Sequence, residues 1–98
     1  MRRFAAFLAL LVSTAATAAI PTSQRNALIA IYDAAGGSSW TNRDGWRGAA
    51  GTECSWYGVS CDDAGANVVF LELYENNLSG TISSKISDLA KLRVLQLW

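Results

Sequence analysis

The amino-acid sequence predicts an α/β protein whose short parallel strands come from successive, similar coils of the chain. Three observations support this prediction: apolar residues recur at an interval of 24 positions after residue 67, an amphipathic helical pattern covers residues 23–35, and two cysteines lie between these regions. A chain of 98 residues allows one small domain at most. Each coil can bury its apolar side only against the next coil, so the predicted fold depends on stacking.

The start of the chain has the composition and order of a secretory signal peptide. Arg2 and Arg3 are followed by an unbroken apolar run at residues 4–12 and by small residues at 13–19, with an A-x-A cleavage site at residues 16–18. An uncleaved membrane anchor is the alternative, but the apolar run is shorter than the roughly 20 residues that a span requires. We therefore expect export, which makes the protein secreted or extracellular, periplasmic or attached to the cell surface.

The charge balance argues against two classes of partner. The sequence has 8 basic and 8 acidic residues, and removal of Arg2 and Arg3 with the signal peptide leaves 6 basic residues. Because there is no basic run and no basic amphipathic helix, we expect no nucleic-acid partner and no binding to a membrane surface. No membrane span is predicted in this chain.

Cys54 and Cys61 are the two cysteines of the sequence, which has no histidine. They are too few for a zinc site, and a redox pair more often has the C-x-x-C spacing. In an oxidising compartment the two thiols can pair, and the chain-entropy model then gives about 2.5 kcal/mol for so small a loop. A structural disulfide is thus favoured over reactive thiols, and no metal or other cofactor is expected.

Helical spacing of apolar residues predicts one short amphipathic helix over residues 23–35. Its apolar stripe consists of Leu28, Ile31, Tyr32 and Ala35. Thr22 or Ser23 is expected to be the N-cap, and Gly36 is suited to the left-handed position that ends a helix. The stripe is expected to pack against the core.

Residues 36–53 are rich in Gly, Ser, Thr, Asn and Asp and are predicted to be irregular. Trp40 and Trp46 interrupt this polar stretch, so we expect the loop to be packed rather than mobile. Trp56 is expected to point inward, and residues 62–67 are expected to form a turn or hairpin loop.

The C-terminal segment contains one full repeat and the beginning of another. Val68, Leu71 and Leu73 match Leu92, Leu95 and Leu97, each pair being separated by the repeat interval. The pattern L-x-x-L-x-L-x-x-N-x-L is filled by Val68, Leu71, Leu73, Asn76 and Leu78. The two strand leucines of the first repeat alternate, so both point to one side.

The remaining repeat positions are expected to close the coil. Asn76 should end the strand and bond backbone groups of the turning chain and of the next coil, and Gly80 should allow a tight bend. Further inward positions are expected at Leu78, Ile82, Ile86 and Leu89. The apolar edge formed by Leu92, Leu95 and Leu97 is expected to be uncovered, which favours dimerisation or aggregation.

These motifs resemble the plant-type leucine-rich-repeat family, which occurs in receptor-kinase ectodomains, polygalacturonase-inhibiting proteins and some bacterial secreted proteins. Residues 68–91 follow the family repeat LxxLxLxxNxLxGxIPxxIxxLxx, except that Ser83 replaces the usual Pro. The capping-domain pattern C-x-W-x-G-V-x-C matches Cys54, Trp56, Gly58, Val59 and Cys61. The resemblance implies that the two cysteines are bridged and that the cap helix and Trp56 cover the exposed end of the first coil.

The resemblance implies the start of an α/β leucine-rich-repeat solenoid. The predicted parts are a signal peptide at residues 1–19, a helical, disulfide-bridged N-terminal cap at 20–67, a first full repeat at 68–91 and a truncated second repeat at 92–98. The strands of the repeats are expected to be parallel. Further repeats are expected to follow Trp98.

A family member of this kind would bind a protein, a peptide or a cell-wall polysaccharide through its concave sheet face. The outward positions there are Phe70, Glu72, Tyr74, Glu75, Val94, Gln96 and Trp98. They are expected to stack as Phe70 on Val94, Glu72 on Gln96 and Tyr74 on Trp98. One alternative is that later repeats make the contacts. Another is that the chain is a purely structural capping fragment of a longer receptor-like or inhibitor protein, without independent activity.

No enzymatic activity is predicted. There is no histidine, and the carboxylates of the sequence lie on predicted loops or exposed strand positions rather than in a shaped pocket. Asn77, Leu78 and Ser79 form an N-x-S sequon, which matters only where the chain is made in a eukaryote.

Overall fold

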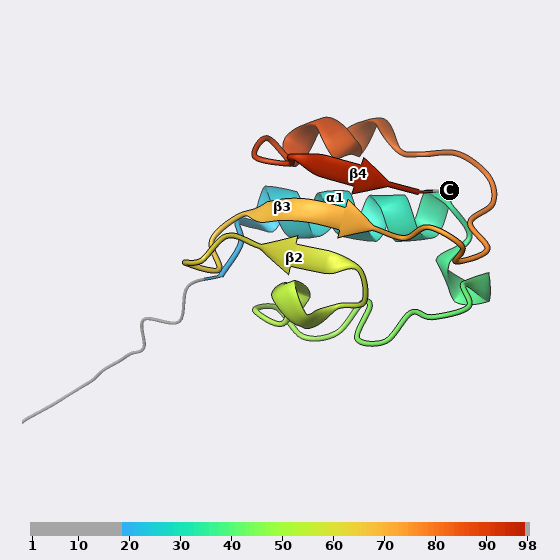
Figure 1. The fold of residues 1–98 in the computed structure, drawn as a ribbon, viewed down its shortest axis with the longest axis horizontal. Coiled ribbons are helices and arrows are strands. Elements are labelled where there is room, and N and C mark those ends of the chain that lie inside the picture. Colours follow the sequence, from blue (N-terminus) through green and yellow to red (C-terminus); the bar gives the residue numbers. More distant parts are fainter. Residues whose placement is uncertain (1–18, 98) are drawn as a thin grey trace, which may run out of the picture.

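The computed structural model describes residues 19–97, so most of the predicted signal peptide and Trp98 lie outside the described residues (Figure 1). The regular elements are helix α1 (Thr22–Ala34), strands β2 (Val59–Cys61), β3 (Val68–Glu72) and β4 (Val94–Gln96), and the 3-10 helices Gly37–Ser39, Glu53–Ser55 and Ser84–Asp88. The strands form one sheet in the order β2-β3-β4, and α1 passes behind it.

Helix α1 forms one residue earlier than predicted and begins differently. The N-cap residue is Pro21, and no side chain caps the helix, so the prediction of Thr22 or Ser23 as N-cap is wrong. Thr22 already has helical geometry, so its hydroxyl cannot take that role. The Pro21 carbonyl instead accepts from the backbone N–H groups of Gln24 and Arg25, at 3.0 and 3.1 Å.

The C-terminal end of α1 is held by the segment that follows β3, which is the predicted return segment of the first repeat. Gly36 has a φ of 73°, which confirms the predicted left-handed residue after the helix. The carbonyls of Ala34 and Ala35 accept from the backbone N–H groups of Thr81 (3.1 Å) and Ser79 (2.9 Å). Gly80, between these donors, has a φ of 82°, and a Cβ there would collide with the Ala34 carbonyl. Glycine is therefore required where the return segment crosses the helix end.

Strands β3 and β4 pair in parallel, with Leu71 opposite Leu95. This confirms the prediction that Leu71 and Leu95 lie side by side on neighbouring parallel strands. Strand β2 pairs with β3 in antiparallel orientation and closes the other edge of the sheet, with a register shift between Ser60 and Cys61. Val68 and Leu71 are three positions apart, so a regular strand would point their side chains to opposite faces of the sheet. The register shift allows both side chains to point inward, and both are fully buried.

The core joins the apolar stripe of α1 to the inward side of the sheet. Its largest fully buried aliphatic side chains are Leu28, Ile31, Val68, Leu71 and Leu73. An aromatic cluster lies beside them, with ring centroids 5.0 to 5.8 Å apart, and consists of Tyr32, Trp40, Trp46 and Trp56. The indoles of Trp40 and Trp46 donate to the carbonyls of Ala35 and Tyr57, which confirms a packed loop.

The return segment of the first repeat carries the 3-10 helix Ser84–Asp88, which packs against α1. Ser83 precedes it with a φ of −62°, an angle that proline also adopts, and its hydroxyl accepts from the Lys85 N–H at 3.1 Å. Serine thus replaces the family's proline with a side-chain cap, and the path of the chain is kept.

On the inward side of the sheet, one row of side chains crosses the three strands, and it is covered at β2 but uncovered at β4. Along this row Val59 is 6% exposed, Leu71 is fully buried and Leu95 is 43% exposed. Leu97 is only 6% exposed because it packs into the core cluster, so the expectation of an uncovered edge that includes Leu97 is wrong. The uncovered apolar surface of β4 is centred on Leu95.

Candidate ligand-binding face

The side of the sheet away from α1 carries outward residues from all three strands. We call this the outer sheet face and define it as Ser60, Phe70, Glu72, Val94 and Gln96. Phe70 lies opposite Val94 and Glu72 opposite Gln96, so two of the expected stacked pairs are neighbours in the parallel register. Phe70, Glu72 and Val94 are half-buried and Gln96 is exposed. The face therefore combines accessible apolar and polar groups.

Tyr74 and Glu75 were expected on the first strand, and this expectation is wrong. Strand β3 ends at Glu72, and both residues lie in the turn that follows. Tyr74 is 51% exposed, and Glu75 has a positive φ of 54°, so the chain leaves the sheet plane there. The expected partner of Tyr74, Trp98, lies outside the described residues.

A shallow hollow borders the outer sheet face at the start of β3. It is lined by Cys61, Asp62, Asp63, Val69, Phe70 and Arg93. The Arg93 N–H donates to the Val69 carbonyl at 2.7 Å, which brings the arginine beside the two aspartates of the hairpin. Sequence analysis missed Arg93 as a candidate, although its place one repeat interval after Val69 was an available signal.

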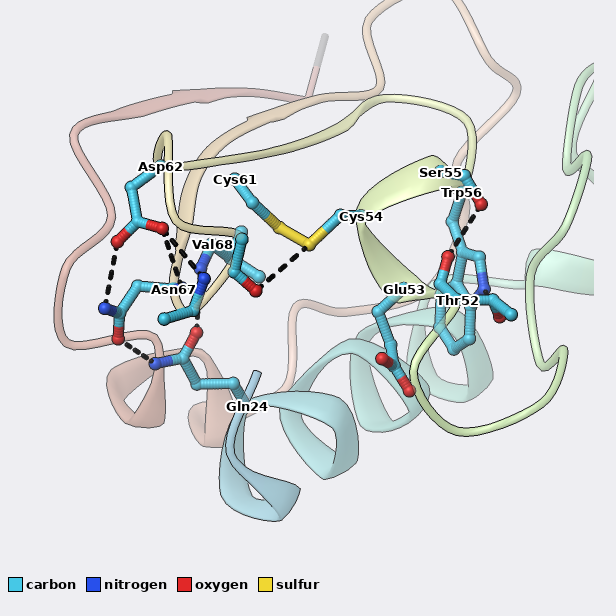
Figure 2. Close-up of a disulfide and its surroundings, with 12 residues drawn as sticks. Gln24, Thr52, Glu53, Cys54, Ser55, Trp56, Cys61, Asp62, Asn67 and Val68 are labelled. Atoms are coloured by element: carbon cyan, nitrogen blue, oxygen red, sulfur yellow. Dashed lines mark hydrogen bonds between the residues drawn. A yellow bond between two sulfur atoms is a disulfide. The ribbon is translucent and has the colours of Figure 1, made fainter. Parts of the chain in front are cut away.

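Asp62 organises the hairpin between β2 and β3 (Figure 2). One carboxylate oxygen accepts from the backbone N–H groups of Ala66 (2.8 Å) and Asn67 (3.3 Å), and the other accepts from the Asn67 side chain at 3.0 Å. The Asn67 side chain, followed by the Ala66 N–H, holds the pKa of Asp62 below its ordinary value. The carboxylate is therefore occupied with hairpin closure.

Acidification should expose this role of Asp62. Because its folded-state pKa is lowered, ionisation stabilises the fold above its ordinary pKa of about 4, and this stabilisation is lost as the pH falls through the lower folded-state value. Urea unfolding midpoints from neutral pH to pH 2 should fall less steeply for Asp62→Asn than for the wild type. Asp63→Asn, a change at the exposed neighbour, should retain the wild-type slope. Equal slopes for all three proteins would contradict this role.

Gln24 connects helix α1 to the same hairpin. The side chain is 4% exposed, its amide nitrogen donates to the Asn67 side chain at 2.9 Å, and its amide oxygen accepts from the Val68 N–H at 2.8 Å. Both halves of this buried amide are thus paired. The first residue of β3 is positioned by the helix as well as by its neighbour strand.

Cys54 and Cys61 form a disulfide, with their Cα atoms 5.6 Å apart (Figure 2). The bridge ties the 3-10 helix Glu53–Ser55 to the end of β2. It closes a short loop that includes Trp56, so it constrains the unfolded chain by about 2.5 kcal/mol in the chain-entropy model. The bridge fixes the edge strand on which the outer sheet face begins.

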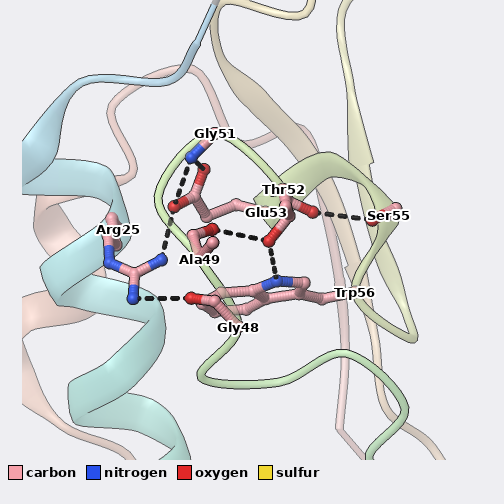
Figure 3. A network of polar contacts seen from close by, with 8 residues as sticks. All are labelled: Arg25, Gly48, Ala49, Gly51, Thr52, Glu53, Ser55 and Trp56. Carbon is pink, nitrogen blue, oxygen red and sulfur yellow. Dashed lines mark hydrogen bonds and ion pairs between the residues drawn. The ribbon is translucent and has the colours of Figure 1, made fainter.

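A second polar network joins α1 to the loop before the disulfide (Figure 3). The Arg25 guanidinium donates to the Glu53 carboxylate at 2.6 Å and to the Gly48 carbonyl at 2.8 Å. The carboxylate also accepts from the Gly51 N–H, and the guanidinium lies 5.3 Å from the centre of the Trp56 ring. The Glu53 side chain is 3% exposed, so a buried charge is matched by a cation and a backbone donor.

The repeat asparagine, Asn76, bonds to residues 40–52, the loop between the first two 3-10 helices, which we call the cap loop. It is 3% exposed, its amide oxygen accepts from the Asn42 N–H at 2.7 Å, and its amide nitrogen donates to the Asn42 carbonyl at 2.8 Å. The expected bond to the next coil is thus replaced by a bond to the preceding segment. The cap loop therefore satisfies both halves of the buried Asn76 amide.

Within residues 19–97, no group of three or more Cys, Asp or Glu side chains is arranged to hold a metal ion. The same part of the chain contains no helix with both the length and the apolar character needed to cross a bilayer.

Comparison with known proteins finds a family that matches the part of the chain that contains the helix, the loop and the disulfide described above. Residues 21–62 match the leucine rich repeat N-terminal domain family. The LRR receptor-like serine/threonine-protein kinase ERL2 of Arabidopsis thaliana is 54% identical over 39 residues, which are 40% of this chain and 4% of that protein. The kinase SIK1 of Oryza sativa subsp. japonica, of the same description, is 42% identical over 52 residues, or 53% of this chain and 5% of that protein. No solved structure matches the chain.

The chain spans only a small part of these relatives, so the activity in their names is not transferred to it. The family match covers the helix, the aromatic loop and the disulfide, and the two cysteines are bridged as the family pattern implies. Residues 21–62 are therefore an N-terminal capping domain of the plant-type leucine-rich-repeat family.

Proposed function

We propose that this chain is part of an exported recognition protein that binds a protein or peptide ligand through its outer sheet face. The observation that carries the proposal is the parallel register, which places Phe70 beside Val94 and Glu72 beside Gln96 on one accessible surface. Apolar side chains beside hydrogen-bonding groups are the usual composition of a protein-binding surface. The relatives support a recognition role because they are named as receptor-like kinases.

The proposed solenoid continues beyond β4. Leu95 is 43% exposed, whereas Leu71, its equivalent one coil earlier, is fully buried. Among residues 19–97, strand β4 has a neighbouring strand on one side only. A further coil of the same kind would cover Leu95 and extend the outer sheet face. Extracellular or cell-surface location is proposed on the leader sequence and on the receptor-like relatives.

The charges near the face favour a ligand with basic residues. Glu72 lies on the face, and Asp62 and Asp63 line the hollow beside Phe70, against the one basic group there, Arg93. Complementary charge raises association rates and sets orientation. No observation points to a cell-wall polysaccharide, and we do not propose one.

A displayed random-peptide library, panned on the secreted and oxidised chain, tests the proposal. Selected peptides should be enriched in Lys and Arg. Phe70→Ala and Glu72→Lys should each weaken their binding about tenfold, which corresponds to roughly 1.4 kcal/mol. Asp88→Lys makes the same charge change on the return segment, away from the face, and should leave binding unchanged.

The alternative is a purely structural cap with no binding of its own. It is favoured because the outer sheet face begins on β2 itself, the strand that the disulfide ties to the cap. Panning that yields no peptide, or peptides whose binding is indifferent to both face variants, would support this alternative and contradict the recognition proposal.

A further inference from the structure

We propose that Asn77 accepts an N-linked glycan when the chain passes through a eukaryotic secretory pathway. Asn77-Leu78-Ser79 is the one N-x-S/T sequon in the sequence, with no proline at its middle position. The proposal rests on export of the chain but not on the outer sheet face, so the two ideas can fail separately.

The folded structure leaves room for a sugar at this position. Asn77 and Ser79 are both exposed, and Asn77 follows the turn after β3 with a φ of 62°, a conformation that asparagine tolerates. The neighbouring Asn76 shows the contrast, because it is 3% exposed and its amide is used in two bonds to Asn42. A sugar on Asn76 would break the cap, whereas a sugar on Asn77 extends into solvent.

The chemistry is also compatible with the contacts of the Asn77 side chain. Its amide nitrogen donates one hydrogen bond, to the Ser39 carbonyl at 2.9 Å. In glycan transfer this nitrogen bonds to the anomeric carbon of a lipid-pyrophosphate-linked oligosaccharide, the carbon–oxygen bond to pyrophosphate breaks, and the nitrogen loses one proton. The product keeps one amide N–H, which is enough to donate to Ser39.

The bond to Ser39 also directs the side chain. Ser39 ends the 3-10 helix that follows α1, so the Asn77 amide reaches toward the cap segment rather than along the strands. The Ser79 N–H is fixed on the Ala35 carbonyl, which holds the other end of the sequon on the same helix end. A glycan at Asn77 therefore leaves from the junction of cap and first repeat.

The test is translation of the full chain with its leader in the presence of eukaryotic microsomes. The protease-protected product should carry one glycan, seen as a mobility shift that an N-glycosidase reverses, and the enzyme should convert Asn77 to aspartate in the peptide map. Ser79→Ala keeps the Asn77 side chain but should abolish the shift. Ser79→Thr and the exposed control Asn26→Gln should retain it.

A protease-protected chain without the shift would overturn the proposal. If the natural leader fails to direct translocation, the proposed export is contradicted instead. The same assay with an established secretory leader placed before Ile20 then decides the acceptor question by the presence or absence of the shift.

Discussion

Replacing Glu53 with alanine is expected to lower the free energy of unfolding by about 3–5 kcal/mol. The substitution removes the carboxylate that pairs with Arg25 and accepts from the Gly51 N–H, and it leaves a cation without its partner against the Trp56 ring. A loss of this size is a large part of the stability of a small domain. Urea unfolding followed by circular dichroism measures it.

Two variants separate the buried charge from other effects. Glu53→Gln keeps an acceptor for Gly51 but removes the charge, so it should lose less than Glu53→Ala. Asp33→Ala breaks the exposed ion pair with Arg47, in which the Asp33 side chain is 61% and the Arg47 side chain 51% exposed. This change should lower the free energy of unfolding by less than about 1 kcal/mol. Equal losses for Glu53→Ala and Asp33→Ala would contradict a special role for the buried pair.

Trp56→Ala is expected to destabilise the chain by a similar amount, about 3–5 kcal/mol. The Trp56 side chain is 1% exposed, its indole nitrogen donates to the Thr52 hydroxyl at 3.0 Å, and its ring centre lies 5.2 Å from that of Trp46. Alanine would leave a cavity between α1 and the disulfide loop, and it would also remove the surface on which Arg25 rests.

Tyr57 provides the matched control because it is the adjacent aromatic residue and is 38% exposed. Its backbone N–H donates to the Asp44 carbonyl and its carbonyl accepts from the Trp46 indole, and both bonds remain possible in Tyr57→Ala. We expect that variant to lose about 1 kcal/mol or less. A Tyr57→Ala loss as large as that of Trp56→Ala would show that the ring of Trp56 is not the centre of this cluster.

The periodic parts of the fold were predictable from the sequence. The repeat interval predicted that Leu71 lies beside Leu95, and the parallel register has this pair. The apolar stripe of α1 predicted its buried face, including Leu28 and Ile31. These predictions succeed because one-sided burial imposes a period on each element, and the period is visible in the chain itself.

Local geometry was predicted less well. The strand was expected to extend through Tyr74 and Glu75, but it ends at Glu72, and the chain turns at Tyr74 and Glu75, where Glu75 has a positive φ. Helix α1 begins at Thr22, and its N-cap is Pro21 rather than a residue with a capping hydroxyl. In both places the sequence allowed more than one local conformation. At the end of β3, the bonds of Asn76 to Thr41 and Asn42 hold the turn, whereas the start of α1 is held locally by the Pro21 carbonyl. Tyr74 and Glu75 were therefore wrongly predicted to lie on the strand.

The sequence alone determined the spacing of the buried side chains, the disulfide pair and the order of helix, loop and strands. Only the tertiary structure decided which distant groups the buried polar side chains satisfy: Glu53 meets Arg25, 28 residues away, Asn76 meets Asn42, 34 residues away, and Gln24 meets Val68, 44 residues away. Burial makes an unpaired polar group costly, so each must find a partner, but the partner leaves no periodic trace in the sequence. It is defined only when the coil, the cap loop and the helix come together.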